Sequence, residues 1–110
     1  MPPNLDDIFT ALGNKHRREI VYTLSLQPSS ISKLAEQRHL TLPAIHKHIK
    51  ILQKCNLVTR KKIGRTNILT INRKSLLKLQ TWLQQFQAYW GHDNESLRNY
   101  EQYLKGGEFK

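Results

Sequence analysis

The fold is decided by the stretch from Ser30 to Leu52, which holds two segments of helical character with a short break between them. The chain reads Ser30-Ile31-Ser32-Lys33-Leu34-Ala35-Glu36-Gln37-Arg38-His39-Leu40 and then Thr41-Leu42-Pro43-Ala44-Ile45-His46-Lys47-His48-Ile49-Lys50-Ile51-Leu52. Ser30 and Thr41 can each cap a helix through a side-chain oxygen, and Pro43 is tolerated because first-turn N–H groups lack partners. The stretch predicts two helices joined by a tight turn at His39-Leu40.

The second of these helices has an apolar side and a basic side. Ile45, Ile49 and Leu52 recur at i, i+4 and i+7, which buries one stripe of the helix. Lys47 and Lys50 lie opposite that stripe. A helix-turn-helix unit places such a second helix in the major groove of DNA, and this requires an apolar inner face and a cationic or small outer face.

A cationic hairpin is expected directly after this unit. Asn56 readily adopts the left-handed conformation that ends a helix. Leu57 to Ile63 and Thr66 to Asn72 then alternate and are rich in β-branched residues. Gly64-Arg65 between them is a two-residue turn signal with glycine first. The order of elements predicts a winged helix-turn-helix, in which the hairpin is the wing.

Further helices are expected on both sides. Leu5, Ile8, Phe9 and Leu12 fall at helical spacing, and Lys15 to Leu26 forms a second helix that Pro28 ends. A long helix begins near Arg73, and the residues Gly91-His92-Asp93-Asn94 break or kink it. We expect one domain over residues 1–110, with a tail at about 91–110. It is mainly α, with five or six helices and a two-stranded wing.

The charge of the chain is concentrated in its middle. The formal net charge is +10 over 110 residues, and between Lys15 and Lys74 fourteen Lys and Arg residues face only Glu19 and Glu36. Such an imbalance favours a polyanion as partner, although a charge run is often a solvated face. An acidic membrane is the rival polyanion, and it is disfavoured because no terminal helix pairs a broad apolar face with a basic one.

Several classes of function have little support. Cys55 is the single cysteine, which excludes an internal disulfide framework and is expected to be a packed small residue. His16, His39 and His92 are scattered without metal-ligand spacing, although a histidine site between two subunits remains an alternative. The sequence has no paired carboxylates, activated nucleophile or phosphate loop, so no enzyme is expected. Without a long apolar run or a signal-peptide pattern, we expect a soluble, cytoplasmic protein.

Two motifs resemble a known family. The first is Thr41-x-Pro43-x-Ile45-x-Lys47-His48-Ile49-x-x-Leu52, which is similar to Ser-x-Pro-x-(Val/Ile)-Ser-Arg-His-Leu-x-x-Leu. The second is Leu12-Gly13-x-x-x-Arg17-Arg18-x-Ile20, which is similar to Leu-(Gly/Ala)-x-x-x-Arg-(Leu/Arg)-x-Ile. Both patterns belong to the winged-helix repressors of the arsenic-repressor (ArsR/SmtB) family. The resemblance runs from about Leu12 to Leu83, and it implies a DNA-binding transcriptional regulator.

The sequence departs from the metal-sensing members of that family. Their Cys-Val-Cys-Asp-Leu-Cys segment corresponds to the residues from Ser30 to Ala35, where every thiolate is missing. Their alternative site needs Asp and His on the last long helix, and Leu76 to Phe86 contains neither. Soft and borderline metals require thiolate or imidazole ligands. We therefore predict no metal and no cofactor, and the aromatic tail resembles that of members without a known metal site.

The resemblance and the charge pattern together predict the residues that contact double-stranded DNA. Their side chains lie on the outer face of the second helix or on the hairpin, with Arg65 at the tip entering a minor groove. The alternatives are solvated lysines on the helix and cationic residues that keep an edge strand from aggregating. The predicted DNA contacts are Thr41, Pro43, Ala44, His46, Lys47, Lys50, Lys54, Arg60, Lys61, Lys62, Arg65 and Thr66.

A long apolar stripe on the last helix predicts a homodimer. Such a stripe could line a ligand pocket, but a helix this apolar in a small chain more simply needs a partner helix. In the family the first and last helices pair across a two-fold axis. The predicted dimer residues are Leu5, Ile8, Phe9, Leu76, Leu79, Trp82, Leu83, Phe86 and Trp90.

The sequence thus predicts a homodimeric, sequence-specific DNA-binding regulator of transcription. We expect a repressor on a pseudo-palindromic operator, with recognition helices in major grooves about 34 Å apart. Two alternatives use the same charge: a non-specific architectural nucleic-acid-binding protein, and a winged-helix module that binds an acidic protein. The effector, if there is one, is not indicated.

Overall fold

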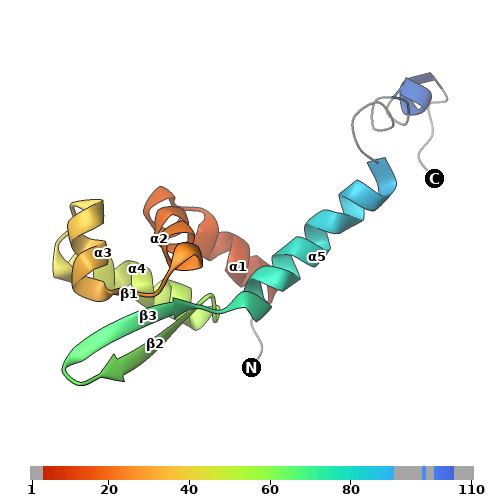
Figure 1. Ribbon diagram of the computed structural model, residues 1–110. Helices are drawn as coiled ribbons and strands as arrows, with labels where there is room; N and C mark the ends of the chain where they lie inside the picture. The colour runs from red at the N-terminus through yellow and green to blue at the C-terminus, as the bar shows by residue number, and fades with distance from the viewer. Residues whose placement is uncertain (1–3, 91–97, 99–100, 106–110) are drawn as a thin grey trace. The chain divides into compact units, whose positions relative to one another are not determined.

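The computed structural model describes residues 4–90, 98 and 101–105, with the backbone alone for residues 87–90. The chain divides into two compact units, Met1–Lys78 and Leu79–Lys110. The elements are α1 (Leu5–Leu12), α2 (Lys15–Leu26), β1 (Ser29–Ser30), α3 (Ile31–Arg38), α4 (Leu42–Lys54), β2 (Val58–Ile63), β3 (Thr66–Ile71) and α5 (Arg73–Trp90), as Figure 1 shows. The mainly helical winged helix-turn-helix predicted from the sequence is confirmed.

Four helices begin at a residue whose side-chain oxygen accepts a backbone N–H three residues later. Ser30 accepts from the N–H of Lys33 at 3.2 Å, and Thr41 accepts from that of Ala44 at 3.3 Å. Both predicted caps are confirmed. Asn4 and Asn14 cap α1 and α2 in the same way. Each cap satisfies one N–H that the first turn would otherwise leave without a partner.

The two helices of the helix-turn-helix end in left-handed residues. His39 (φ 55°) follows α3, and the N–H of Leu40 donates to the carbonyl of Ala35 at 2.9 Å. Asn56 (φ 56°) follows α4, and the N–H of Leu57 donates to the carbonyl of Leu52 at 3.0 Å. This arrangement satisfies carbonyls at a helix end and turns the chain sharply. The predicted turn at His39-Leu40 and the predicted role of Asn56 are confirmed.

The wing is an antiparallel hairpin with a short third strand at its base. Gly64 has φ +62° in the two-residue turn between β2 and β3, as its place in the sequence predicts. The strand order is β1-β3-β2, with Ser29 opposite Leu69 and Ser30 opposite Ile68. The prediction of a two-stranded wing omitted β1, because two serines show no alternation of apolar and polar residues. β1 pairs the base of the wing with the residues that lead into α3.

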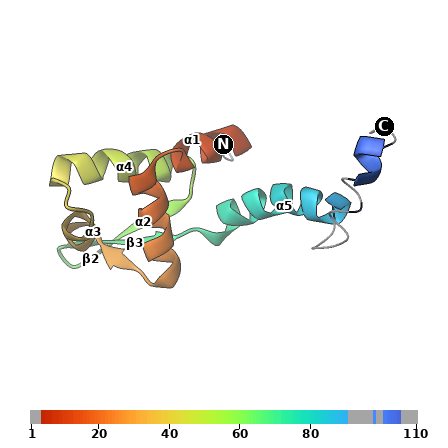
Figure 2. The ribbon, with the colours of Figure 1, turned by 90° about the horizontal axis from the view of Figure 1, so that it is seen from above.

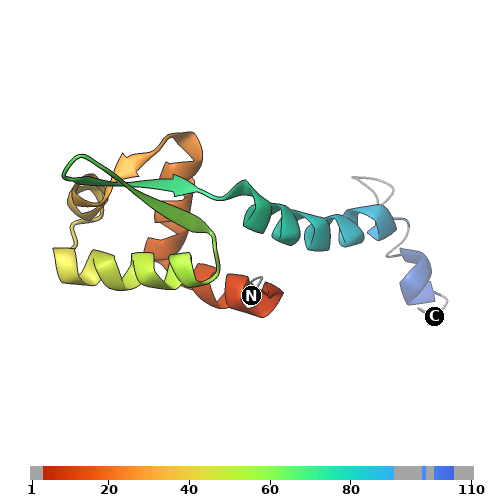
Figure 3. The ribbon, with the colours of Figure 1, turned by 90° about the horizontal axis from the view of Figure 1, so that it is seen from below.

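The core of the first unit lies between the helices and the sheet. Figures 2 and 3 show α2 crossing from α4 to the sheet, so that it packs against both. The predicted α4 stripe is fully buried there. The apolar core is formed by Ile8, Ala11, Ile20, Leu24, Ile31, Leu34, Ala35, Ile45, Ile49, Leu52, Cys55, Leu57, Val58 and Leu69. Burial of these side chains fixes which face of α4 points outward.

One predicted dimer residue lies in this core. Ile8 on α1 has no exposed surface (0%), so the prediction that it contacts a partner subunit is wrong. The α1 spacing that suggested an exposed stripe instead packs Ile8 and Ala11 against the same protomer. Phe9 on α1 is 42% exposed, and Leu5 is half-buried. These two residues keep surface that a partner could cover.

The long helix α5 is joined to the first unit at its beginning. The hydroxyl of Ser75, which is buried, donates to the carbonyl of Asn56 at 2.7 Å. This bond ties the first turn of α5 to the end of α4. The predicted start near Arg73 is confirmed.

In the second unit, the described part of α5 carries a row of partly exposed apolar side chains. Trp82 and Phe86 lie edge to face, with ring centroids 4.8 Å apart. Leu83 is 50% and Phe86 46% exposed, while Leu79 and Trp82 are half-buried. Residues 101–105 are helical, whereas the predicted break at 91–94 lies outside the described residues. Within the described residues, no helix is long and apolar enough to cross a membrane.

We predict that the buried stripe of α4 dominates the stability of the first unit. Replacing Ile49 (1% exposed) by alanine should lower the free energy of unfolding by about 2–5 kcal/mol, because it removes buried methyl groups and leaves a cavity. Ile51→Ala on the same helix, where the side chain is 38% exposed, is the matched control and should cost clearly less. Urea denaturation measures both, and equal losses would contradict the assigned orientation of α4.

Candidate nucleic-acid interface

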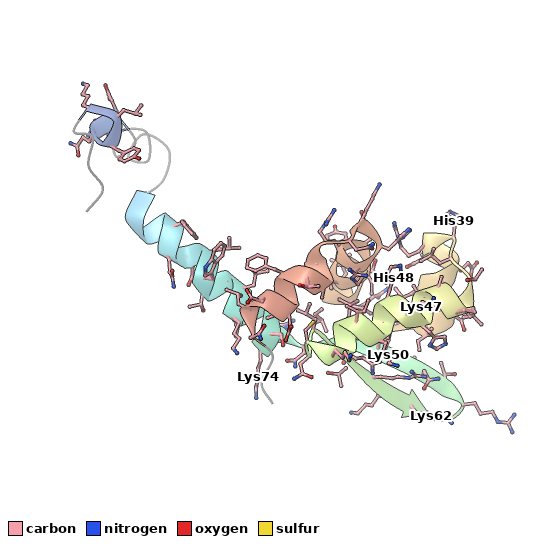
Figure 4. The ribbon with its side chains drawn as sticks, turned by 180° about the vertical axis from the view of Figure 1, so that it is seen from behind. His39, Lys47, His48, Lys50, Lys62 and Lys74 are labelled. Atoms are coloured by element: carbon pink, nitrogen blue, oxygen red, sulfur yellow. The ribbon has the colours of Figure 1, made fainter. Side chains whose placement is uncertain are left out.

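The outer face of α4 is basic and open. Lys47, Lys50 and Lys54 are exposed, and so are Pro43 and His46. Figure 4 shows Lys47 and Lys50 on α4 and Lys62 on the hairpin. These positions lie opposite the buried stripe of α4, as the helical spacing predicted. The face therefore combines the long cationic side chains of the lysines with the imidazole of His46. The short side chain of Pro43 leaves room for a ligand to approach the helix backbone.

The start of α4 adds two further predicted residues to this face. Thr41 is exposed, and although its oxygen accepts from the N–H of Ala44, its O–H can still donate. Ala44 is half-buried at the edge of the face. Leu42 is 51% exposed and adds an apolar patch.

The basic residues of the wing divide between its two faces. Arg60 lies opposite Leu69 and Lys62 opposite Asn67, whereas Lys61 lies opposite Ile68. Because Leu69 and Val58 are buried, Arg60 and Lys62 share the face that is continuous with the core, and Lys61 lies on the other face. This division follows from the alternation of side chains along a strand. Arg65 and Thr66 are exposed at the turn.

A hydrogen bond links the two strands of the wing near its tip. The Nε of Arg60 donates to the Oδ1 of Asn67 at 3.2 Å. Asn67 was not among the predicted site residues, because a single asparagine in a strand gives no signal in the sequence. A cavity of about 210 Å³ lies beside it and is lined from α3, α4 and the wing. Ser32 of α3 also lines this cavity and was likewise not predicted.

On the other side of α4, two arginines and two histidines form a half-buried cluster that connects four helices. Arg17 of α2 donates from Nη1 to His48 Nδ1 of α4 at 3.2 Å, and its Nε donates to the carbonyl of Ala11 of α1. Arg38 of α3 donates from Nη2 to His16 Nδ1 at 3.3 Å. The rings of His16 and His48 are 5.5 Å apart. The sequence separates these residues too widely for the cluster to be predicted from spacing.

The cluster is a structural junction in which the Nδ1 atoms of both histidines face arginine donors. An arginine can only donate, so each histidine Nδ1 must carry a lone pair. The pKa of His48 is lower than its ordinary value, mainly because the ring is partly buried. The charge of Arg17 is the second cause and the neighbouring His16 the third. Within the described ranges, no group of three or more His, Cys, Asp or Glu residues could hold a metal ion. His16, which the sequence places without metal-ligand spacing, lies against His48 in this junction.

Cys55 is a packed residue, as the sequence predicted. It is buried, its thiol donates to the carbonyl of Leu52 at 3.4 Å, and burial raises its pKa. A thiol in this state is a poor nucleophile at neutral pH.

These features define a winged helix-turn-helix DNA-binding protein, and comparison with known proteins gives its family. Residues 14–60 match the bacterial regulatory protein arsR family. The HTH-type transcriptional regulator Rv2034 of Mycobacterium tuberculosis is 30% identical over 81 residues, which is 74% of this chain and 76% of that protein. The chain belongs to the ArsR family of bacterial transcriptional regulators, whose members are DNA-binding proteins and not enzymes.

Solved structures show the same fold. The ArsR family transcriptional regulator RHA00566 is 29% identical, with a TM-score of 0.71 over 86% of this chain and 100% of that chain. The homodimeric winged helix-turn-helix DNA-binding domain of Mb0332 from Mycobacterium bovis, a possible ArsR-family regulator, is 17% identical. Its TM-score is 0.61 over 81% of this chain and 87% of that chain.

We predict that acidification loosens the arginine–histidine cluster. The pKa of His48 is lower in the folded protein than its ordinary value of about 6.5, so below that pH the unfolded chain binds more protons. The stability that neutral His48 contributes to the folded protein is therefore fully present above about pH 6.5, and it is lost as the pH falls through the pKa of His48 in the folded protein. Urea denaturation between about pH 5 and 8 should show a flatter profile for His48→Gln than for the natural protein.

His46→Gln is the matched control for this experiment. It removes an exposed histidine from the same helix and should keep the natural pH profile of stability. Identical profiles for His48→Gln and the natural protein would show that His48 does not carry the effect.

Proposed function

We propose that the chain is a homodimeric, sequence-specific DNA-binding regulator that represses transcription by occupying a pseudo-palindromic operator. The observation that supports this most strongly is the outer face of α4, where Lys47, Lys50 and Lys54 stand opposite a fully buried stripe. A helix fixed in this way can lie in a major groove with its cationic side toward the bases and phosphates. Binding of a dimer to two successive half-sites would block access to a promoter.

The side chains of α4 are assigned to base edges and to the nearest phosphates. Lys47 and Lys50 are long enough to reach guanine O6 or N7, although an ammonium reads guanine less sharply than the bidentate arginine common in the family. His46 can donate to a base edge, and Leu42 can contact a thymine methyl. Thr41, Pro43, Ala44 and Lys54 flank this set and are assigned to the sugar–phosphate backbone.

The wing is assigned to the neighbouring minor groove. Arg65 at the exposed turn can enter a narrow A·T-rich groove, where the potential attracts a guanidinium. Lys62, Arg60 and Thr66 can approach the same backbone strand. Lys61 points to the opposite face of the wing and would meet a phosphate only where the DNA bends around the tip.

The apolar surface that is left exposed is assigned to a second copy of the chain. Leu79, Trp82, Leu83 and Phe86 give α5 a side that is costly to leave in water, and Leu76 extends it toward the start of the helix. Leu5 and Phe9 of α1 can supply the matching surface. The M. bovis domain, which has the same fold and is homodimeric, supports the inference of a dimer. Trp90 stays a proposed contact, since its side chain lies outside the described residues.

The whole chain of 110 residues then works as one DNA-binding domain whose end helices make the dimer. The absence of thiolates from Ser30 to Ala35 supports a regulator that senses no metal at that segment. A cytoplasmic location follows from the proposed contact with chromosomal DNA. The rival function, a non-specific architectural protein, differs in having equal affinity for all sequences.

Replacing Lys47 by alanine tests the base-reading role of α4. Affinity for the preferred duplex should fall about tenfold, in line with about 1–2 kcal/mol for a base contact, and affinity for random duplex should fall less. Fluorescence anisotropy with both duplexes measures this difference. Lys15→Ala removes an exposed lysine of α2 and is the control for loss of charge alone. Equal losses on both duplexes for Lys47→Ala would remove it from the base-reading set.

Replacing Arg65 by alanine tests the role of the wing. Affinity should fall for all sequences, and the slope of log K against log salt should flatten by about 1.8, because each of two subunits loses one contact worth about 0.9. Titrations at four or five salt concentrations give the slope. An unchanged slope would place Arg65 away from the DNA.

Replacing Phe86 by glutamate tests the dimer. The charge should split the dimer, because it would be buried in an apolar contact without a partner. Sedimentation equilibrium should show a monomer for Phe86→Glu and a dimer for Gln85→Glu, which adds the same charge at the neighbouring exposed position. A dimer that persists in Phe86→Glu at the same protein concentration would exclude this face of α5 as the interface.

A further inference from the structure

The proposed arrangement on DNA has a geometric consequence at the gap between α4 and the wing. Any major groove is separated from the adjacent minor groove by one sugar–phosphate strand. If α4 lies in the major groove and Arg65 enters the minor groove next to it, that strand must cross between α4 and the tip of the wing. This inference rests on the proposed function, which places α4 in the major groove and Arg65 in the minor groove.

The structure has a cavity at that place. Its volume is about 210 Å³, several times the roughly 30 Å³ that one water occupies in the liquid. It is lined by Ser30, Ile31 and Ser32 from the start of α3, by Leu42 and His46 from α4, and by Arg65, Thr66 and Asn67 from the wing. The cavity therefore lies between α4 and the wing, where the DNA strand must pass.

The chemistry of the lining suits an anion. Ser32 and Thr66 offer hydroxyl donors, Arg65 offers a guanidinium, and His46 offers a ring N–H. The residues that line the cavity in the described part of the chain include no carboxylate. Leu42 gives the wall an apolar patch that a deoxyribose beside the phosphate can contact.

Asn67 is oriented by a contact outside the cavity. Its Oδ1 accepts from Arg60 Nε at 3.2 Å, which leaves its amide N–H groups as the remaining donors of the side chain. Arg60 is therefore a positioning residue for Asn67. Since Asn67 lines the cavity, its amide can donate to an anion held there.

We propose that this cavity seats one phosphodiester of the strand that separates the two grooves. Ser32, Thr66 and Asn67 donate to its non-bridging oxygens, and Arg65 passes beside it into the minor groove. The contact fixes the register of α4 along the groove without reading a base, because phosphate contacts position the protein. Ser32 and Asn67 thereby join the DNA-binding surface.

The test uses the full-length protein and a duplex selected from a randomised pool. Single phosphates of one half-site are replaced, one at a time, by neutral methylphosphonates, and affinities are compared between the natural protein and Ser32→Ala/Asn67→Ala. At the linkage between the two grooves, the neutral group should cost the natural protein about tenfold, as expected for hydrogen bonds to a charged group. The double variant should lose little more at that linkage, because it has already lost the contact.

Ser25→Ala is the control, since it removes an exposed serine hydroxyl from α2, an element that does not line the cavity. It should show the natural pattern of sensitivity at every linkage. Losses that are the same in the natural protein and the double variant at all linkages would overturn the cavity assignment while leaving the proposed function intact. Failure of the natural protein to prefer any duplex would overturn the proposed function and this inference together.

A free phosphate ester is the other source of the same chemical group. Inorganic phosphate is therefore titrated into the complex at constant ionic strength. No release of the DNA beyond that caused by chloride is expected. Release by phosphate from the natural protein, with no such release from the double variant, would assign the cavity to a free ligand and overturn the backbone assignment.

Discussion

The burial of Ile45, Ile49 and Leu52 against the rest of the first unit is the constraint on which the structure depends. These side chains have almost no exposed surface, so α4 cannot rotate about its axis without exposing them to water. The rotation that buries them places Lys47 and Lys50 outward. The hydrophobic effect thus sets the direction of the charged side chains, and the caps at Thr41 and Asn56 set where the helix begins and ends.

Two groups of polar contacts hold the remaining parts around α4. On one side, Arg17 of α2 donates to the carbonyl of Ala11 on α1 and to Nδ1 of His48 on α4, which accepts this bond only when it carries a lone pair. On the other side, β1 pairs the base of the wing with the entrance to α3, and Arg60 holds Asn67 near the tip. The helix proposed to read DNA is therefore flanked by the arginine–histidine junction and by a wing whose register is fixed by strand pairing.

The parts that follow from local rules could be predicted from the sequence. Caps, the Gly64 turn, the left-handed Asn56 and the two faces of α4 each depend on a few neighbouring residues. Arg17 and His48, which share a hydrogen bond, are 31 positions apart in the sequence. Ser32 and Asn67, which line the same cavity, are 35 positions apart, and no local pattern predicts either pairing. Ile8 shows the same limit, because helical spacing identifies an apolar stripe but not whether the same chain or a partner covers it. The proposed DNA and dimer contacts remain predictions.

The most direct test of sequence-specific binding by a homodimer is selection of the purified protein on a pool of randomised duplexes at near-physiological salt, followed by sequencing of the bound fraction. We predict enrichment of a palindromic motif with half-sites about one helical turn, or about 34 Å, apart, because two α4 helices related by a two-fold axis would reach successive major grooves. Tight binding without enrichment of any motif would contradict it and would indicate an architectural protein that recognises the charge of DNA alone.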